Sequence, residues 1–332
     1  MRFETGENEA GRRLDRVLKK IFRNLPLSFI YKTIRKDVKV NGKRVSGETL
    51  LKAGDVVEIF LSDKQMEEYS RIPSEIPTKR KQFGIIFEDE NVLVADKPYG
   101  LLTHGDTVEK KNTLANQVAS YLAETGAWVP GGMRTFTPAP ANRLDRNTTG
   151  IVLFGKTLPA ARDFAQMLRG GEDGNMYVEK AYLTVVKGEM KAPLLLKAQM
   201  VRDSEKNITK VLSKNSDRGL AMATEVRPLA AGRGFTLVEA SLLTGRTHQI
   251  RVQLADAGFP VIGDRKYGCA ETNRMVAREY GLTSQLLHAY RLTVKNGLGS
   301  LEYLKGTTFR AKLPGRFTEI MEDLGCVTKT KL

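Results

Sequence analysis

Residues 139–157 place one acidic side chain in a setting that is unusual for a structural residue. Asp145 lies between Arg143 and Arg146, and a polar, turn-prone stretch then leads into the apolar run 151–154. Loops that end at the edge of a rigid sheet often carry catalytic groups. An aspartate beside an arginine more commonly forms a structural ion pair or caps a turn. Asp145 is therefore a candidate catalytic carboxylate that needs support from elsewhere in the chain.

A tyrosine in the run 178–186 is the second candidate. Alternation along the strand expected here places Lys180, Tyr182 and Thr184 on the same face. A strand tyrosine is usually half-buried, with its hydroxyl group hydrogen-bonded. Its position alone therefore does not distinguish a packing role from a catalytic one.

An arginine near the start of an expected helix is the third candidate. The strand 235–241 is followed by a turn at residues 244–245 and by a helix that Gly258 ends. Arg251 falls off the apolar line of that helix, in an early turn. A guanidinium there is shaped to pair with a phosphate or a carboxylate, although a helical arginine is more often a surface residue.

Composition limits the classes of protein to which these residues can belong. The 332 residues exceed the usual size of one hydrophobic core, so we expect two domains of unequal size. With 41% hydrophobic and 27% charged residues, the chain is typical of a globular protein. The net charge of +15 indicates a polyanionic partner, and the lack of a long apolar stretch favours nucleic acid over a membrane.

Cysteine and histidine usage argues against a metal centre and a disulfide framework. Cys269 and Cys326 are too few and too far apart for either, and this pattern fits a reducing cytoplasm. His104, His248 and His288 are scattered, without the spacing of a zinc or iron site. The N-terminus has no apolar segment of the kind found in secretion signals. We therefore expect a cytoplasmic protein that uses no metal.

The first 61 residues are predicted to form a small basic module. Apolar residues at helical spacing follow Arg12, a second helix follows Pro26, and the dipeptide at 41–42 indicates a tight hairpin. The segments RRLDRVLKKIF, SFIYKTIRKDVKVNGKRV and LKAGDVVEIF resemble an S4 domain, a small RNA-binding module. The resemblance implies phosphate contacts by basic surface residues, of which we single out Arg13, Lys32, Arg35 and Lys36.

Residues 62–82 are polar and charged and contain two prolines, which is typical of a linker. A second domain, residues 83–332, then begins with apolar strands at 83–87 and 92–95 that are joined by a short polar turn. Such neighbouring strands favour a mixed or antiparallel sheet, and the intervening periodic segments predict helices. The expected fold class is α+β.

Three segments of this second domain carry a family resemblance. NRLDRNTTG, EKAYLTVVKG and LLTGRTHQIRVQL, followed by GFPVIGDRKYG, resemble the signature segments of the RluA-type pseudouridine synthases over residues 83–317. With the S4-like module, the chain resembles the RluC and RluD type members, which modify large-subunit ribosomal RNA. It departs from the family pattern at Asn142 and Gln253, where histidine is usual.

The resemblance implies an isomerase built on a mixed, largely antiparallel sheet with flanking helices. Uridine would be converted to pseudouridine without a cofactor, with Asp145 as nucleophile, Arg251 as its basic partner and Tyr182 stacking on the base. A carboxylate suits this chemistry because cleavage of a glycosidic bond builds positive charge on the sugar. The residues leave open whether Asp145 adds to C1′, adds to C6 or removes a proton from the sugar.

RNA contacts within this domain are implied as well. The target uridine must leave its helix before its C1′ and C5 atoms can be reached. Arg143, Arg146 and Arg246 would then hold phosphates or fill the gap in the helix. We expect a monomer that binds RNA and no membrane.

Two other functions remain open at this point. A ribosome-associated, S4-bearing protein that only binds RNA would keep the positive charge without needing Asp145, Tyr182 and Arg251 together. A phosphodiester-cleaving enzyme would need clustered carboxylates with a metal, or paired histidines. The sequence supports the second alternative least, because it shows neither pattern.

Overall fold

The chain divides into two compact units. The computed structural model describes residues 1–6, 8–22, 25–62, 64–65, 69, 80–129, 136–170, 176–203, 208–212 and 219–328. The first unit comprises residues 1–81, 116–139 and 156–158, and the second comprises 82–115, 140–155 and 159–332. Most of the expected linker, 62–82, lies outside the described residues. The sequence did not indicate that 116–139 and 156–158 would group with the first unit.

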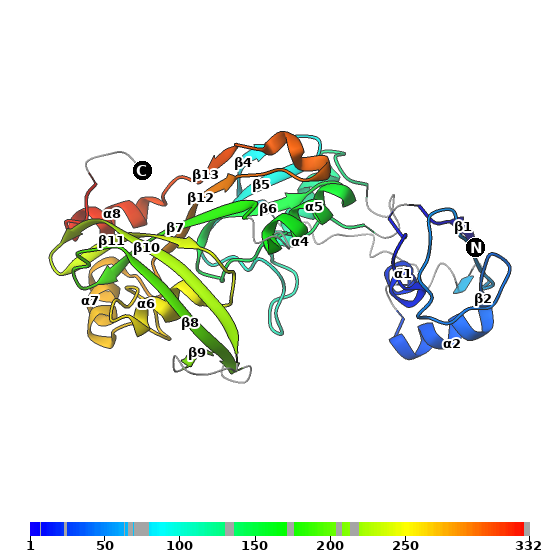
Figure 1. Ribbon diagram of the computed structural model, residues 1–332, viewed down its shortest axis with the longest axis horizontal. Coiled ribbons are helices and arrows are strands. Elements are labelled where there is room, and N and C mark those ends of the chain that lie inside the picture. The colour runs from blue at the N-terminus through cyan, green and yellow to red at the C-terminus, as the bar shows by residue number, and fades with distance from the viewer. Residues whose placement is uncertain are drawn as a thin grey trace. The chain divides into compact units, whose positions relative to one another are not determined.

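The described part of the first unit contains short helices and a small antiparallel sheet (Figure 1). Its elements are α1 (Leu14–Ile21), α2 (Leu27–Asp37), most of α4 (Leu114–Glu124) and a sheet in the order β1 (Arg2–Glu4), β3 (Val56–Ile59), β2 (Val38–Val40). The apolar line of α1 is buried, as its spacing predicts. Asn41 and Gly42 have positive φ values of 51° and 74°, which confirms the predicted tight turn.

A ten-stranded sheet forms the centre of the second unit (Figure 1). Its order is β4 (Gly84–Glu88), β5 (Val92–Lys97), β6 (Thr149–Gly155), β12 (Leu287–Val294), β7 (Val178–Lys187), β11 (Phe235–Leu242), β10 (Leu220–Gly232), β8 (Leu194–Asp203) and β9 (Ile208–Leu212), and β13 (Thr308–Arg310) pairs with β12. Only β6 and β12 pair in parallel among the described strands. The predicted mixed, largely antiparallel sheet is therefore confirmed.

Helices pack against this sheet through apolar side chains. The helices of the second unit are α5 (Leu158–Arg169), α6 (Gln249–Asp256), α7 (Ala270–Tyr280), η1 (Gly299–Leu304) and α8 (Gly315–Asp323). Phe164 of α5 packs with strand residues such as Ile151, which forms one core cluster. Val276 of α7 and Phe317 of α8 belong to a second cluster, with Leu183 of β7. These two clusters fix the strands from which the candidate residues project.

Close approach of β6 and β12 requires a glycine at one position. Gly150 has a φ of 105°, and a Cβ atom there would lie 2.2 Å from the Ala289 carbonyl oxygen. Only glycine avoids this clash while adopting such a backbone conformation. Ala289 in turn pairs with Tyr182 on β7. The register thus brings the strand that follows Asp145 to within two strand spacings, about 10 Å, of Tyr182.

Candidate active site

The loop that carries Asp145 is held on both sides of that residue. The Thr103 hydroxyl donates to the Leu144 carbonyl at 2.9 Å and accepts from the Leu144 amide at 3.2 Å. On the other side, Lys97 Nζ donates to the Arg146 carbonyl at 2.9 Å. These bonds fix the backbone immediately before and after Asp145, so the position of its side chain is well defined.

Lys97, at the end of β5, is the more unusual of these two supports. Its side chain is fully buried, and Nζ also donates to the carbonyls of Pro98 and Leu101, at 3.1 and 2.8 Å. Burial lowers the pKa of the amine to about 7, although the nearby carboxylates of Asp145 and Asp96 favour the charged form. The protonated amine has three N–H donors for three acceptors.

Arg251 holds the carboxylate of Asp145 directly. Its Nη1 donates to Asp145 Oδ2 at 2.7 Å, while Nε and Nη2 donate to the two oxygens of Asp264 at 2.6 and 2.8 Å. Arg251 is 5% exposed and Asp264 is fully buried. The expected pairing of Arg251 with a carboxylate is thus present, but the arginine is inside the protein instead of on the helix surface.

Asp264 makes this arrangement rigid. Its Oδ1 also accepts from the backbone amides of Lys266 and Tyr267, at 2.9 and 3.2 Å. Burial alone would raise the pKa of Asp264, but its hydrogen bonds with Arg251 and the charge of that residue lower it. In turn, the hydrogen bonds and negative charges of Asp264 and Asp145 raise the pKa of Arg251 despite its burial. Both groups therefore stay charged, and Asp264 fixes the guanidinium whose remaining Nη1 reaches Asp145.

Tyr182 lies in the same region and is almost completely buried, at 7% exposure. Burial raises the pKa of its phenol, and the negative charge of nearby Asp145 raises it further. The phenol is therefore neutral at physiological pH. It can stack on a base or donate a hydrogen bond, but it does not supply a phenolate.

His248 is a further member of the site that the sequence did not reveal. Its Nε2 lies 3.9 Å from Asp145 Oδ2, and its Nδ1 lies 2.9 Å from the Tyr267 hydroxyl. That hydroxyl accepts from the Thr209 amide at 2.8 Å, so its own hydrogen is available for His248 Nδ1. When the Tyr267 hydroxyl donates to Nδ1, the hydrogen of the neutral imidazole is on Nε2, which faces Asp145. Burial lowers the pKa of His248 to about 4, so the ring is neutral.

The two oxygens of Asp145 have different surroundings. Oδ2 accepts from Arg251 and lies near His248. Among the described residues, none donates a hydrogen bond to Oδ1, and the side chain is 28% exposed. The carboxylate is therefore fixed through one oxygen and has the other available.

The other residues singled out from the sequence lie on surfaces. Arg143 and Arg146 are exposed beside Asp145 in its loop, and Arg246 is exposed just before α6. In the first unit, Lys32, Arg35 and Lys36 are exposed on α2. Arg13 instead bonds to Asp15 at 2.8 Å.

Both departures from the family pattern have structural roles. Asn142 Nδ2 donates to the Ile151 carbonyl at 3.2 Å, and Asn142 Oδ1 accepts from the Leu153 amide at 2.8 Å. Gln253 is buried and joins Thr224 of β10 to the Leu196 carbonyl of β8, at 2.7 and 2.9 Å. Both side chains thus fasten elements around the site.

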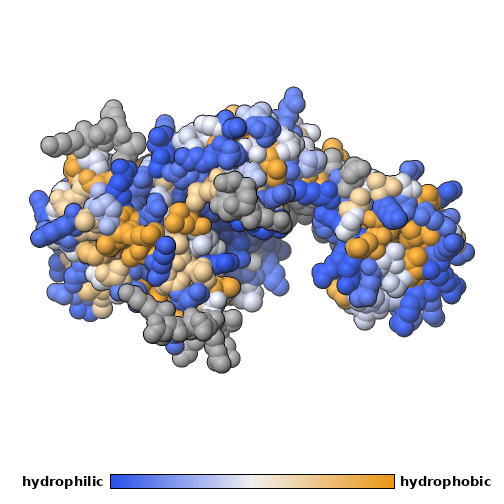
Figure 2. Space-filling model, viewed as in Figure 1, coloured by the Kyte–Doolittle hydropathy of each residue, from blue (hydrophilic) through white to orange (hydrophobic). Residues whose placement is uncertain are grey.

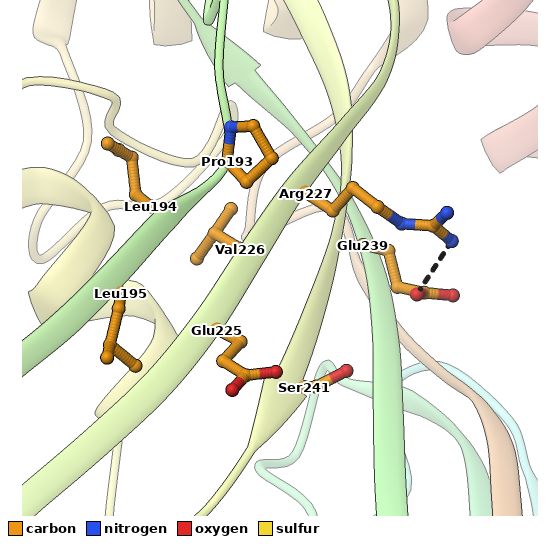
Figure 3. Close-up of a pocket in the computed structure, with 8 residues that line it drawn as sticks. All are labelled: Pro193, Leu194, Leu195, Glu225, Val226, Arg227, Glu239 and Ser241. Carbon is orange, nitrogen blue, oxygen red and sulfur yellow. Dashed lines mark hydrogen bonds and ion pairs between the residues drawn. The ribbon is translucent and has the colours of Figure 1, made fainter.

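A groove lies on a different part of the sheet. It encloses about 380 Å³ between β8, β10 and β11, and Figure 3 shows Arg227 paired with Glu239 at its side. Glu239 pairs in register with Leu183, which points to the face opposite Tyr182. Figure 2 shows apolar residues gathered over β10 and β11, and Leu195 beside them is 52% exposed. The groove is therefore separate from the Asp145 region.

Two negative observations apply to the described part of the chain. Its helices are each too short or too polar to cross a lipid bilayer. Nor do any three of its histidine, cysteine, aspartate and glutamate side chains come together in a group that could hold a metal ion.

Comparisons with known proteins identify relatives along most of the chain. Residues 91–256 match the family described as RNA pseudouridylate synthase. Ribosomal large subunit pseudouridine synthase C of Pasteurella multocida is 33% identical over 302 residues, which cover 86% of this chain and 83% of that protein. Its counterpart in Escherichia coli is 32% identical, with coverage of 86% and 85%. The solved structure of human RNA pseudouridylate synthase domain containing 4 covers 73% of this chain and 92% of its own, with a TM-score of 0.56 and 22% identity.

Proposed function

The chain belongs to the RNA pseudouridylate synthase family, and we propose that it isomerises uridines of large-subunit ribosomal RNA to pseudouridine. The contact of Arg251 Nη1 with Asp145 Oδ2 at 2.7 Å carries this proposal. This contact holds the Asp145 carboxylate in a fixed position in the same region as Tyr182. The names of the relatives support the choice of ribosomal RNA.

The reaction needs only groups that this site contains. The bond from uracil N1 to ribose C1′ breaks, the base turns, and a bond from C5 to C1′ replaces it. The hydrogen of C5 is lost and N1 gains one, so the reaction is a balanced isomerisation without an oxidant. In our proposal Asp145 is the nucleophile, and Oδ1 is the reacting oxygen because Arg251 holds Oδ2.

Each neighbour of Asp145 has a distinct role in this proposal. Arg251 orients the Asp145 carboxylate, and Asp264 fixes Arg251. Tyr182 stacks on the extracted uracil and stays protonated because burial and Asp145 raise its pKa. His248 directs an N–H toward Asp145 Oδ2, which further favours Oδ1 as the reactive atom.

RNA binding is assigned to both units in this proposal. Residues 1–61 act as an S4-like RNA-binding domain, 62–82 as a linker and 83–332 as the catalytic domain. Arg143, Arg146 and Arg246 contact the RNA around a flipped uridine, since a stacked uridine keeps C1′ and C5 out of reach. Lys32, Arg35 and Lys36 contact phosphates farther along the RNA. We propose that the protein acts as a cytoplasmic monomer without a cofactor.

Tritium release tests the proposed function. Large-subunit ribosomal RNA transcribed with uridine tritiated at C5 should lose tritium to water when the purified protein is added, because C5 becomes the glycosidic carbon. Carbodiimide mapping of the same RNA then identifies the modified position. Binding without release would favour a protein that only binds RNA, and shortened RNA would favour phosphodiester cleavage. Either result would contradict the proposal.

A further inference from the structure

Lys180 is a cationic side chain of the candidate active site that has no counter-ion among the described residues. It lies on β7, where the register with β11 is regular from Lys180 to Lys187. Residues two apart on a strand share a face and lie about 7 Å from each other. Lys180 and Tyr182 therefore project from the same side of the sheet.

The surroundings of Lys180 differ sharply from those of Lys97. Lys97 is fully buried, and three carbonyl oxygens accept its hydrogens. Lys180 is half-buried, but no described residue accepts a hydrogen bond from its amine or pairs with its charge. Desolvation of an unpaired ammonium group costs free energy that the protein itself does not recover at this position.

Asp145 does not fill this role for Lys180. Arg251 already holds Asp145, and burial alone lowers the pKa of Lys180, without a contribution from any carboxylate. The nearest acidic neighbour on the strand, Glu179, faces the other way and pairs with Lys295 at 2.8 Å. The Lys180 ammonium group therefore takes part in no ion pair within the part of the chain that the structure describes.

The turn before α6 forms one wall of the Lys180 site. A Cβ atom on Gly245 would lie 3.7 Å from Lys180 Nζ, so the ammonium group lies beside this turn. Gln249 holds the turn in place by accepting from the Arg246 amide at 3.0 Å and from the Thr244 hydroxyl at 2.8 Å. The exposed side chain of Arg246 adds a second positive charge to the same turn.

We propose that Lys180 and the 244–246 turn bind a phosphate group of the RNA beside the uridine that enters the active site. This proposal rests on the proposed function and assigns part of its substrate-binding surface. A polyanion supplies the missing counter-ion, and the short distance along β7 from Tyr182 places that phosphate next to the extracted base. Lys180 binds substrate in this account and takes no part in bond breaking.

Salt dependence of RNA binding tests the proposal without turnover. Asp145→Asn protein is compared with Asp145→Asn protein that also carries Lys180→Gln, using unmodified large-subunit ribosomal RNA transcript. Loss of one phosphate contact should weaken binding about tenfold and lower the slope of log K against log salt by about 0.7. Lys180→Arg should keep the slope. An unchanged slope in Lys180→Gln would overturn the proposal.

A matched control separates a local contact from a general loss of charge. Lys197 is exposed on β8, and its register partner Ala223 points away from the face of Thr224 and Tyr182. Lys197→Gln therefore removes one charge from the opposite face of the same sheet. It should lower the slope far less than Lys180→Gln, and equal losses would count against a specific site.

Thermal stability distinguishes a binding role from a structural one. Removal of an unpaired, partly desolvated charge should leave the melting temperature of Lys180→Gln unchanged or raise it, whereas a structural lysine would show a lower value. A lower melting temperature with a normal salt slope would overturn the proposal.

Neutral phosphate analogues identify the group that is bound. Short RNAs that contain the mapped uridine receive a methylphosphonate at each flanking position in turn. At one position, the parent protein should lose affinity while Lys180→Gln loses none, and equal losses in both at every position would overturn the assignment. Because binding is measured without turnover, a failed isomerisation assay and a failed Lys180 assignment give different results.

Discussion

Each of the two units contains an arginine that donates two hydrogen bonds to a buried aspartate, but the two arginines differ in their exposure to solvent. In the first unit Arg13 donates to both oxygens of Asp15, at 3.2 and 2.8 Å, and in the second Arg251 does the same to Asp264. The Arg13 side chain is 38% exposed and that of Arg251 is 6% exposed. Ion pairs of the same type therefore lie in very different environments.

The third contact of each arginine shows what burial changes. Arg13 also reaches Glu48, whose side chain is 75% exposed, at 3.1 Å. Arg251 instead reaches Asp145. Water screens the first contact, whereas the second acts where few solvent molecules compete. Because the ion pair of Arg251 with Asp264 is buried, Arg251 can also orient the carboxylate of Asp145.

The comparison also separates Arg13 from the other basic residues of its unit. Asp15 accepts from the Tyr31 hydroxyl at 2.7 Å as well, so this cluster joins the start of α1 to α2. The charge of Arg13 is largely balanced within the unit, whereas Lys32, Arg35 and Lys36 are exposed. We therefore expect the α2 residues to carry most of the RNA affinity of this unit.

The largest effect is expected from Arg251→Met. It leaves Asp264 as an uncompensated buried charge, which should destabilise the protein by about 3–5 kcal/mol and abolish turnover. Urea unfolding followed by circular dichroism measures the loss. Arg13→Met is the matched control and should shift the transition only slightly. Equal shifts for the two variants would show that burial does not distinguish the two clusters.

A smaller effect is expected from Lys97→Met, which leaves three carbonyls without their donor. We expect a loss of about 1–3 kcal/mol at pH 7. The exposed Lys191 provides the control, because Lys191→Met should leave stability nearly unchanged. A stability equal to that of the wild type would contradict the role of Lys97 in holding the Asp145 loop.

Lys97 also predicts a pH dependence of stability. Its pKa is about 7 in the folded protein and 10.5 as the ordinary value, so between these values the unfolded chain binds a proton that the folded chain lacks. The free energy of unfolding should therefore rise with pH from about 7 to 10.5. The wild type should show this rise relative to Lys97→Met in urea titrations at each pH. If the free energy of unfolding changed with pH in the same way for the wild type and Lys97→Met, the lowered pKa of Lys97 would be contradicted.

The smallest effect is expected on RNA binding by the first unit. Combined Lys32→Gln, Arg35→Gln and Lys36→Gln should reduce the slope of log K against log salt by about 2, since each phosphate contact contributes about 0.7. Arg13→Gln should reduce it far less. Filter binding to large-subunit ribosomal RNA over a range of salt concentrations provides the measurement. A larger change with Arg13→Gln would reverse our ranking of these residues.

Local sequence patterns predicted much of the sheet but less of the site. Alternating and continuous apolar runs indicated β4, β5, β6, β7 and β11, because such runs reflect burial on one or both faces of a strand. The long strands β8 and β10 were not anticipated. Several of their side chains are exposed, as with Leu195 and Leu220, so their pattern lacks the usual contrast between a buried and an exposed face.

Helix α6 shows why the burial of Arg251 could not be predicted. Six consecutive residues of this helix are buried, among them Gln249, Arg251 and Gln253. A helix with polar partners on several sides has no single apolar stripe, so periodicity fails to describe it. Arg251 pairs with Asp145, which lies 106 residues earlier in the chain, and local sequence patterns do not encode contacts over such a separation.

Asp264, Lys97 and His248 were missed for a related reason. Each acts through contacts with distant backbone or side-chain groups, which folding alone brings together. A signal for Asp264 was present nonetheless, because a carboxylate two residues after the apolar pair Val261 and Ile262 is a candidate for a buried ion pair. The family resemblance named Asp145, Tyr182 and Arg251, and the structure places Arg251 in contact with Asp145.

Tritium release by Asp145→Asn protein tests the central claim most directly. Asparagine keeps the size of the side chain and can still contact Arg251, but it removes the reactive oxygen. We predict that the variant binds large-subunit ribosomal RNA nearly as well as the wild type and releases no tritium from uridine labelled at C5. Release above a few per cent of the wild-type rate would contradict the assignment of Asp145 as the nucleophile.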